Sequence, residues 1–157
     1  MGSSVRTGGQ TNTNVQWTPL AESRIVYVMQ FRPSAADRPL VSVVDDDESV
    51  RESLPDLLKE FGFAARAFSS AEEFLSSDCV GQTRCLLLDI YMAGMTGPGL
   101  QQELKVRQHH IPIIFMTAKT NGNLRPQLLQ EGAVECLFKP FSDTALFDAV
   151  NTALGPT

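Results

Sequence analysis

The sequence predicts an α/β fold in which five strands of a doubly wound parallel sheet alternate with five helices. Short apolar and β-branched runs recur along residues 39–155, and segments with apolar residues at helical spacing lie between them. A polar or charged residue follows most of the apolar runs. This pattern is typical of a parallel sheet whose strands all end at the same edge.

Each predicted strand is a short apolar run bounded by turn residues or charges. The third run is continuously apolar, as in a strand covered on both faces, and it ends at Asp89 before a glycine-containing loop. In chain order, the predicted strands are Leu40–Val44, Phe63–Phe68, Arg84–Leu88, Ile111–Met116 and Val134–Phe138. The alternation implies right-handed crossovers between them. The expected strand order is 2-1-3-4-5, in which the first and third strands are neighbours at the switch point.

The segments between these strands have helical spacing and recognisable ends. Gly62 and Gly132 stop the first and fourth helices, Ser70 caps the second, and Ser142 or Asp143 caps the last. The predicted helices contain Val50–Phe61, Ala71–Leu75, Leu100–Val106, Leu124–Leu129 and Leu146–Leu154. In the last helix, the residues expected to face inward are Leu146, Phe147, Val150 and Leu154.

The first 38 residues have a different composition. Met1 to about Asn14 is mostly Gly, Ser, Thr, Asn and Gln, which cannot bury enough apolar surface to offset the entropy lost on ordering. Ile25–Met29 has strand character, but Arg32 and Pro33 separate it from the regular pattern that begins at Pro39. We expect residues 1–38 to form a disordered or weakly structured extension and residues 39–155 to form the folded domain.

Charge and cysteine content narrow the classes of function. Residues 1–38 carry a net charge of +2 and residues 39–157 carry −7, within a total of −5. An acidic domain is a poor partner for nucleic acid, so we expect no direct nucleic-acid binding by this domain. The three cysteines are odd in number and show no metal-binding spacing, which favours a reducing, cytoplasmic setting. No apolar run reaches the length of a membrane span.

The strand ends carry a set of residues that suits phosphoryl chemistry. Asp45 and Asp46 follow the first strand, Asp89 the third, Thr117 the fourth and Lys139 the fifth. In the predicted strand order the three acids converge, and such crowding is unfavourable without a cation or a proton. Oxygen ligands without His or Cys suit Mg²⁺, and a carboxylate in that setting can accept a phosphoryl group. The Thr117 hydroxyl and Lys139 would balance charge on the phosphoryl oxygens.

From Pro39 to Leu154 the chain resembles the receiver domain of two-component response regulators, most closely receivers of the nitrogen-fixation-regulator type. The matching motifs are Val43–Arg51, Leu88–Asp89 with Met92 and Met95–Gly97, Ile114–Thr117, Gly132–Ala133 and Lys139–Phe141. The resemblance implies a flavodoxin-like fold and a phosphorylation-dependent signalling module with Mg²⁺ as cofactor. It further implies a histidine kinase or phosphotransfer protein as phosphoryl donor, an unidentified downstream protein target and homodimerisation on phosphorylation.

The resemblance also implies a role for each site residue. Asp89 would be the phosphoacceptor, Asp46 a direct Mg²⁺ ligand and Asp45 a ligand acting through water. Tyr91 would bind the metal through its backbone carbonyl. Thr117 would be the switch hydroxyl and Lys139 the partner of the phosphate. Such a protein is not an enzyme beyond catalysing its own phosphotransfer and slow dephosphorylation.

Four residues depart from the family pattern. Ala93 stands where the family usually has proline, so the loop after Asp89 should be less rigid. Pro55 and Pro126 should kink or shorten the first and fourth helices, because each removes a backbone donor. Cys136 occupies the strand-five position of the aromatic residue that moves inward on phosphorylation.

Other functions are weighed against this one. A phosphohydrolase with a strand-end aspartate needs a second acid two residues on, where this chain has Tyr91. A flavin-binding protein needs a Ser/Thr/Gly cradle after the first strand, where this chain is acidic. A phosphorylation-independent interaction module and the N-terminal fragment of a DNA-binding regulator remain as alternatives. His109 and His110 are interpreted as loop residues, not as phosphoryl donors.

Overall fold

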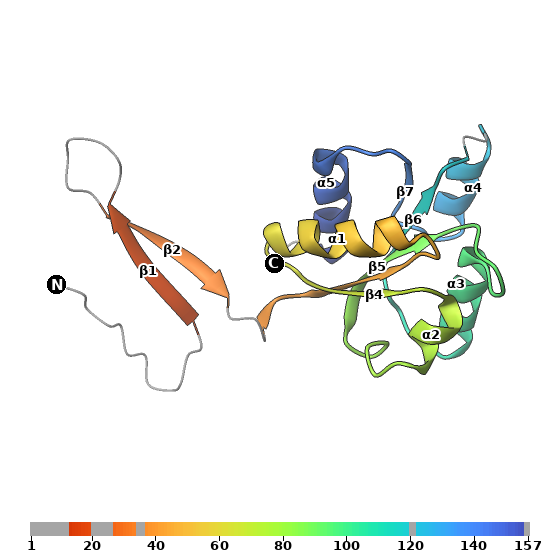
Figure 1. Ribbon diagram of the computed structural model, residues 1–157, viewed down its shortest axis with the longest axis horizontal. Helices are drawn as coiled ribbons and strands as arrows, with labels where there is room; N and C mark the ends of the chain where they lie inside the picture. Colours follow the sequence, from red (N-terminus) through yellow and green to blue (C-terminus); the bar gives the residue numbers. More distant parts are fainter. Residues whose placement is uncertain (1–12, 20–26, 34–36, 120–121, 156–157) are drawn as a thin grey trace. The chain divides into compact units, whose positions relative to one another are not determined.

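The computed structural model describes residues 13–19, 27–33, 37–119 and 122–155. The chain divides into two compact units, Met1–Arg38 and Pro39–Thr157 (Figure 1). The boundary between them coincides with the start of the predicted folded domain. The assignment of residues 1–38 as a disordered or weakly structured extension remains a prediction.

The second unit is an open parallel sheet with helices on both faces. In chain order its elements are β3 (Leu40–Val44), α1 (Glu48–Glu60), β4 (Ala64–Phe68), α2 (Ala71–Ser76), β5 (Thr83–Asp89), α3 (Gly97–Val106), β6 (Ile113–Thr117), α4 (Leu124–Gln130), β7 (Glu135–Phe138) and α5 (Asp143–Leu154). The strands lie in the order β4-β3-β5-β6-β7, and all four pairings are parallel. Counted within this unit the order is 2-1-3-4-5, which confirms the predicted topology.

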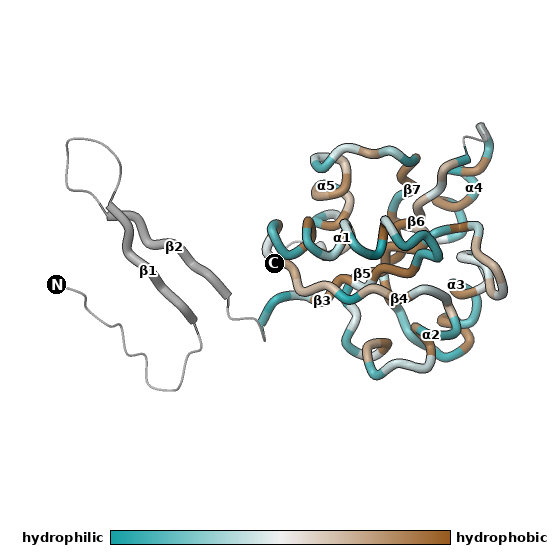
Figure 2. The backbone as a smooth tube through the Cα atoms, viewed as in Figure 1, coloured by the Kyte–Doolittle hydropathy of each residue, from teal (hydrophilic) through white to brown (hydrophobic). Residues whose placement is uncertain are grey.

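The central strand β5 contributes to both faces of the sheet. Its Leu86 and Leu88 belong to the apolar cluster that includes buried residues of α2, α3 and α4, whereas Cys85 and Leu87 belong to the cluster shared with α1 and α5. Figure 2 shows the hydrophobic colouring concentrated on the inner strands. Because successive side chains of a strand point to opposite faces, a continuously apolar strand requires helices on both sides.

Side chains cap most of the helices where the sequence predicts a helix start. The Asp47 side chain accepts a hydrogen bond from the Ser49 amide at α1, and Ser70 caps α2 through the Glu73 amide. Ser142 caps α5, which resolves the choice left open between Ser142 and Asp143. These caps satisfy backbone donors that have no partner within the helix.

The two prolines are expected to kink or shorten their helices, and the structure bears on the length alone. Helix α1 runs for 13 residues with Pro55 inside it, so it is not shortened. Pro126 is the third residue of α4, where a backbone N–H would have no intrahelical partner to lose. Proline is therefore tolerated at this position without interrupting the helix.

The inward orientation predicted for Phe147 is wrong. Phe147 is 39% exposed, and its ring centroid lies 5.0 Å from that of Phe61. Leu146 and Val150 are fully buried, as predicted, and Leu154 is partly buried. Helical spacing indicates which residues share a face, but the neighbouring helix determines how far across that face burial extends.

The first unit contains an antiparallel hairpin of β1 (Thr13–Pro19) and β2 (Tyr27–Pro33), with Thr13 opposite Pro33. Thr13 and Asn14, at the end of the segment expected to be disordered, pair within this hairpin, and that expectation remains a prediction. Residues 1–12 and the first two residues of the predicted strand Ile25–Met29 lie outside the described residues.

Candidate functional site

Three carboxylates meet at the carboxyl edge of the parallel sheet. Asp45 and Asp46 follow β3, and Asp89 ends the neighbouring strand β5. Their ligand atoms all lie within 4.8 Å of one another, with Asp45 and Asp89 buried and Asp46 exposed. Because β3 and β5 are neighbouring parallel strands, their carboxyl ends bring the three acids into a single site, as the sequence predicts.

Lys139 supplies a positive charge at this acidic site. Its Nζ atom lies 2.7 Å from Oδ2 of Asp45 and 3.7 Å from Oδ1 of Asp89. The lysine follows β7, two strands away from Asp89 in the sheet, so its side chain reaches across the edge. One ammonium group beside three carboxylates leaves an excess of negative charge, which favours binding of a cation.

Backbone contacts hold Asp45 in place. Its Oδ1 atom accepts a hydrogen bond of 2.9 Å from the Asp47 amide, and its backbone N–H donates to Phe68 of β4. Arg51, on the first turns of α1, donates from Nη1 to the Asp45 carbonyl at 3.0 Å. The sequence interpretation assigned no role to Arg51, although it lies within the motif at the end of the first strand.

The pKa of Asp89 is raised to about 6, first by burial and then by the neighbouring charge of Asp45, with Lys139 acting in the opposite direction. Only 7% of the residue is exposed. Burial and like charge both disfavour the ionised carboxylate. A carboxylate with a raised pKa at a strand end is typical of a group that reacts or binds a ligand.

Thr117 is the last residue of β6, and Tyr91 lies in the loop that follows Asp89. Thr117 is fully buried, and its Oγ1 atom accepts a hydrogen bond of 3.1 Å from the Lys119 amide. The Lys119 ammonium lies 4.4 Å from the centroid of the Tyr91 ring, a distance typical of a cation–π interaction. The predicted roles of the Thr117 hydroxyl and of the Tyr91 carbonyl remain predictions.

Comparison with known proteins agrees with this geometry. Residues 41–151 match the family model described as the response regulator receiver domain. The chain belongs to this family. The sheet order and the helices on both faces are those of a flavodoxin-like receiver fold, and receiver domains of this kind are signalling domains of two-component systems.

Several relatives of the receiver domain are named as regulators. This chain is 41% identical over 114 residues to the transcriptional regulatory protein TdiR of Thauera aromatica, and the match covers 73% of this chain and 50% of the relative. It is 38% identical over 115 residues to the transcriptional regulatory protein FixJ of Azorhizobium caulinodans, covering 73% and 54%. The chain thus spans about half the length of these relatives.

Solved structures of response regulators are similar to this chain in fold. The response regulator StyR superimposes with a TM-score of 0.69 at 43% identity, covering 74% of this chain and 59% of that one. The crystal structure of FixJ-N superimposes with a TM-score of 0.67 at 33% identity, covering 75% and 94%. Within the described residues, no helix is long and apolar enough to cross a membrane.

Cys136 lies on β7, the fifth strand of the receiver domain in chain order, and is buried in the core. Cys136 is 3% exposed and packs in the cluster shared with α4, and burial raises its pKa. The preceding residue, Glu135, accepts a hydrogen bond from Arg125 of α4 at 2.7 Å. This ion pair links α4 directly to β7, a contact that the sequence interpretation did not foresee.

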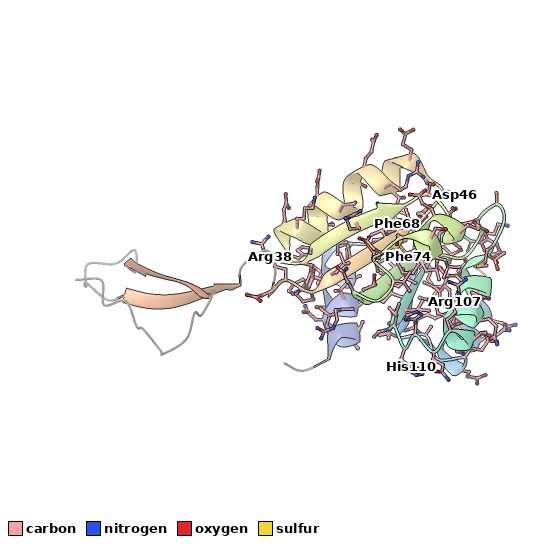
Figure 3. The ribbon with its side chains drawn as sticks, turned by 90° about the horizontal axis from the view of Figure 1, so that it is seen from below. Arg38, Asp46, Phe68, Phe74, Arg107 and His110 are labelled. Atoms are coloured by element: carbon pink, nitrogen blue, oxygen red, sulfur yellow. The ribbon has the colours of Figure 1, made fainter. Side chains whose placement is uncertain are left out.

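The two histidines lie away from the acidic site. His109 and His110 line a pocket of about 360 Å³ together with residues of α3 and of the loop before β7. Figure 3 separates the labelled His110 widely from Asp46. This placement agrees with their interpretation as loop residues.

Proposed function

We propose that this receiver domain accepts a phosphoryl group on Asp89 in the presence of Mg²⁺ and relays the signal through protein contacts. The observation that supports this most strongly is the convergence of Asp45, Asp46 and Asp89 beside Lys139. The donor would be a histidine kinase or a phosphotransfer protein, and the target a protein that recognises the phosphorylated surface. The cytoplasm is the expected compartment.

The residues of the site fit Mg²⁺ as the cofactor. The donor set consists of carboxylate oxygens within 4.8 Å of one another, and no His or Cys belongs to the cluster among the described residues. Hard oxygen ligands in small number are what Mg²⁺ prefers. Asp46 would bind the ion directly, Asp45 through water, and Asp89 and the Tyr91 carbonyl would complete the set. When bound, Mg²⁺ supplies positive charge that stabilises both the ionised Asp89 and the phosphoryl oxygens.

The phosphoryl transfer uses the ionised form of Asp89. A carboxylate oxygen of Asp89 forms a bond to phosphorus while the bond from phosphorus to the donor atom breaks, and the donor atom keeps the electron pair. Lys139 is placed 3.7 Å from Asp89, within reach of a phosphoryl oxygen attached there. A phosphoryl oxygen there would compete with Asp45, 2.7 Å away, for the ammonium group of Lys139.

Phosphorylation by a small acyl phosphate tests this proposal. The wild-type protein is expected to gain one phosphoryl group in the presence of Mg²⁺ and none after chelation, because the excess acidic charge otherwise repels the donor. Intact-protein mass spectrometry gives the result. If the protein gains no phosphoryl group with Mg²⁺, the phosphorylation-independent interaction module becomes the better explanation.

The metal assignment is tested by Asp46→Ala. We expect the affinity for Mg²⁺ to fall at least roughly tenfold, because this variant removes the exposed carboxylate of the site. Titration calorimetry measures the change. Asp56→Ala is the matched control, since Asp56 is an exposed acid in the middle of α1 and its loss changes the net charge equally. Equal affinities in Asp46→Ala and wild type would contradict the assignment.

The conformational change on phosphorylation is expected to differ from that of relatives with an aromatic residue in place of Cys136. A ring buries more apolar area than a thiol, a difference of about 1 kcal/mol or more, comparable with the ~1–3 kcal/mol of a typical allosteric coupling. We therefore expect movement of the α4 segment to carry the signal, with the Arg125–Glu135 ion pair responding to it.

Chemical-shift changes on phosphorylation measure this difference. They should concentrate at residues 117–126, stay small at Cys136, and grow on β7 in Cys136→Tyr. Part of that range, residues 120 and 121, lies outside the described structure. Largest changes at Cys136 in the wild-type protein would show that side-chain size does not limit the switch.

A further inference from the structure

A side chain of α2 contacts the loop that follows Asp89. The Oε1 atom of Glu72 accepts a hydrogen bond of 2.8 Å from the Met95 amide, 23 residues away in the sequence. This hydrogen bond is the first cause of the lowered pKa of Glu72. The carboxylate is solvent-exposed, yet it is directed at the backbone of the loop between β5 and α3.

The loop is shaped to receive this carboxylate. Gly94 has a positive φ of 77°, and a Cβ atom there would lie 3.0 Å from Oε1 of Glu72. Glycine therefore permits both the turn and the close approach of Glu72. The neighbouring Met95 side chain packs against the apolar core, and Thr96 caps α3. These contacts fix the C-terminal end of the loop, next to α3.

Hydrogen bonds also fix the N-terminal end of the loop, next to β5. The Ile90 amide donates to the Met116 carbonyl at 3.1 Å, and the Gly97 amide donates to the Ile90 carbonyl at 2.9 Å. Between these anchors lie Tyr91 and the exposed Ala93. Alanine restricts the backbone less than proline does, so this stretch depends more on hydrogen bonds for its conformation.

We propose that Glu72 is a positioning residue for the phosphorylation site, because its carboxylate fixes the loop that carries Tyr91. The hydrogen bond to Met95 replaces the stiffness that a proline at position 93 would give. Glu72 touches neither metal nor phosphoryl group, and it acts through the backbone between Tyr91 and Met95. This inference rests on the proposed function, since it assigns the Tyr91 carbonyl to Mg²⁺.

Two variants of Glu72 separate its hydrogen bond from its charge. Glu72→Ala removes the acceptor, and we expect Mg²⁺ affinity to fall roughly tenfold. This is the low end of the loss of metal affinity seen when a residue that supports a metal ligand is removed. Glu72→Gln keeps the Oε1 acceptor and should bind Mg²⁺ nearly as wild type does. Titration calorimetry measures affinity, and amide hydrogen exchange of the metal-free protein should be faster at Met95 only in Glu72→Ala.

Glu73→Ala is the matched control on the same helix. Glu73 accepts hydrogen bonds from the amide and hydroxyl of Ser69, so its loss weakens the start of α2 without touching the loop. Equal Mg²⁺ affinity in Glu72→Ala and wild type, or equal weakening in Glu73→Ala, would overturn the role of Glu72. Absence of Mg²⁺ binding by the wild-type protein would instead overturn the proposed function.

Discussion

Asp89→Asn is expected to abolish phosphoryl transfer to this protein from a small acyl phosphate with Mg²⁺. Asparagine keeps nearly the same shape, but its amide is not a nucleophile toward phosphorus. Asp45 is fully buried and paired with Lys139 at 2.7 Å. Asp46, the exposed acid of the site, is assigned to Mg²⁺ in the proposed function, which leaves Asp89 as the acceptor. Borohydride trapping followed by peptide mass spectrometry should locate the label of the wild-type protein on Asp89.

Asp56→Asn is the control for this experiment and should keep the label. It changes the charge by the same amount on the exposed side of α1. A label that persists in Asp89→Asn would contradict the assignment of the phosphoacceptor. So would a label on His109 or His110, which line a separate pocket.

Asp89→Asn is also expected to stabilise the metal-free protein at neutral pH. The pKa of Asp89 is raised from 3.8 to about 6 by burial and by Asp45. A shift of about two units corresponds to a free-energy cost on the order of 2 to 3 kcal/mol for the ionised carboxylate. Urea unfolding in the presence of a chelator should show Asp89→Asn to be more stable than wild type by about this amount at pH 7.

The pH dependence of this stability difference has a definite sign. Between pH 4 and pH 6 the folded protein binds more protons at Asp89 than the unfolded chain, so the stability of wild type relative to Asp89→Asn falls as pH rises. The difference should be small below pH 4 and complete above pH 6. Comparing the two proteins cancels the opposite effect of carboxyls with lowered pKa, such as Glu135. A difference that is independent of pH would show that the charge of Asp89 is not the cause.

Much of the fold could be predicted from the sequence because its patterns are local. The apolar run ending at Asp89, the helical spacing after Asp45 and the stop at Gly62 each depend on neighbouring residues alone. The repetition of strand and helix then leaves few topologies for a parallel sheet. The convergence of the acids at one edge is a consequence of that topology, which explains why the candidate site could also be predicted.

Contacts between distant segments are what only the tertiary structure decided. The pairing of Lys139 with Asp45 more closely than with Asp89, the Arg125–Glu135 ion pair and the contact of Glu72 with Met95 join elements with no shared sequence pattern. The partial exposure of Phe147 depends likewise on its neighbours in space. Periodicity determines which face of an element a residue occupies, whereas the packing of other elements determines which partner it meets.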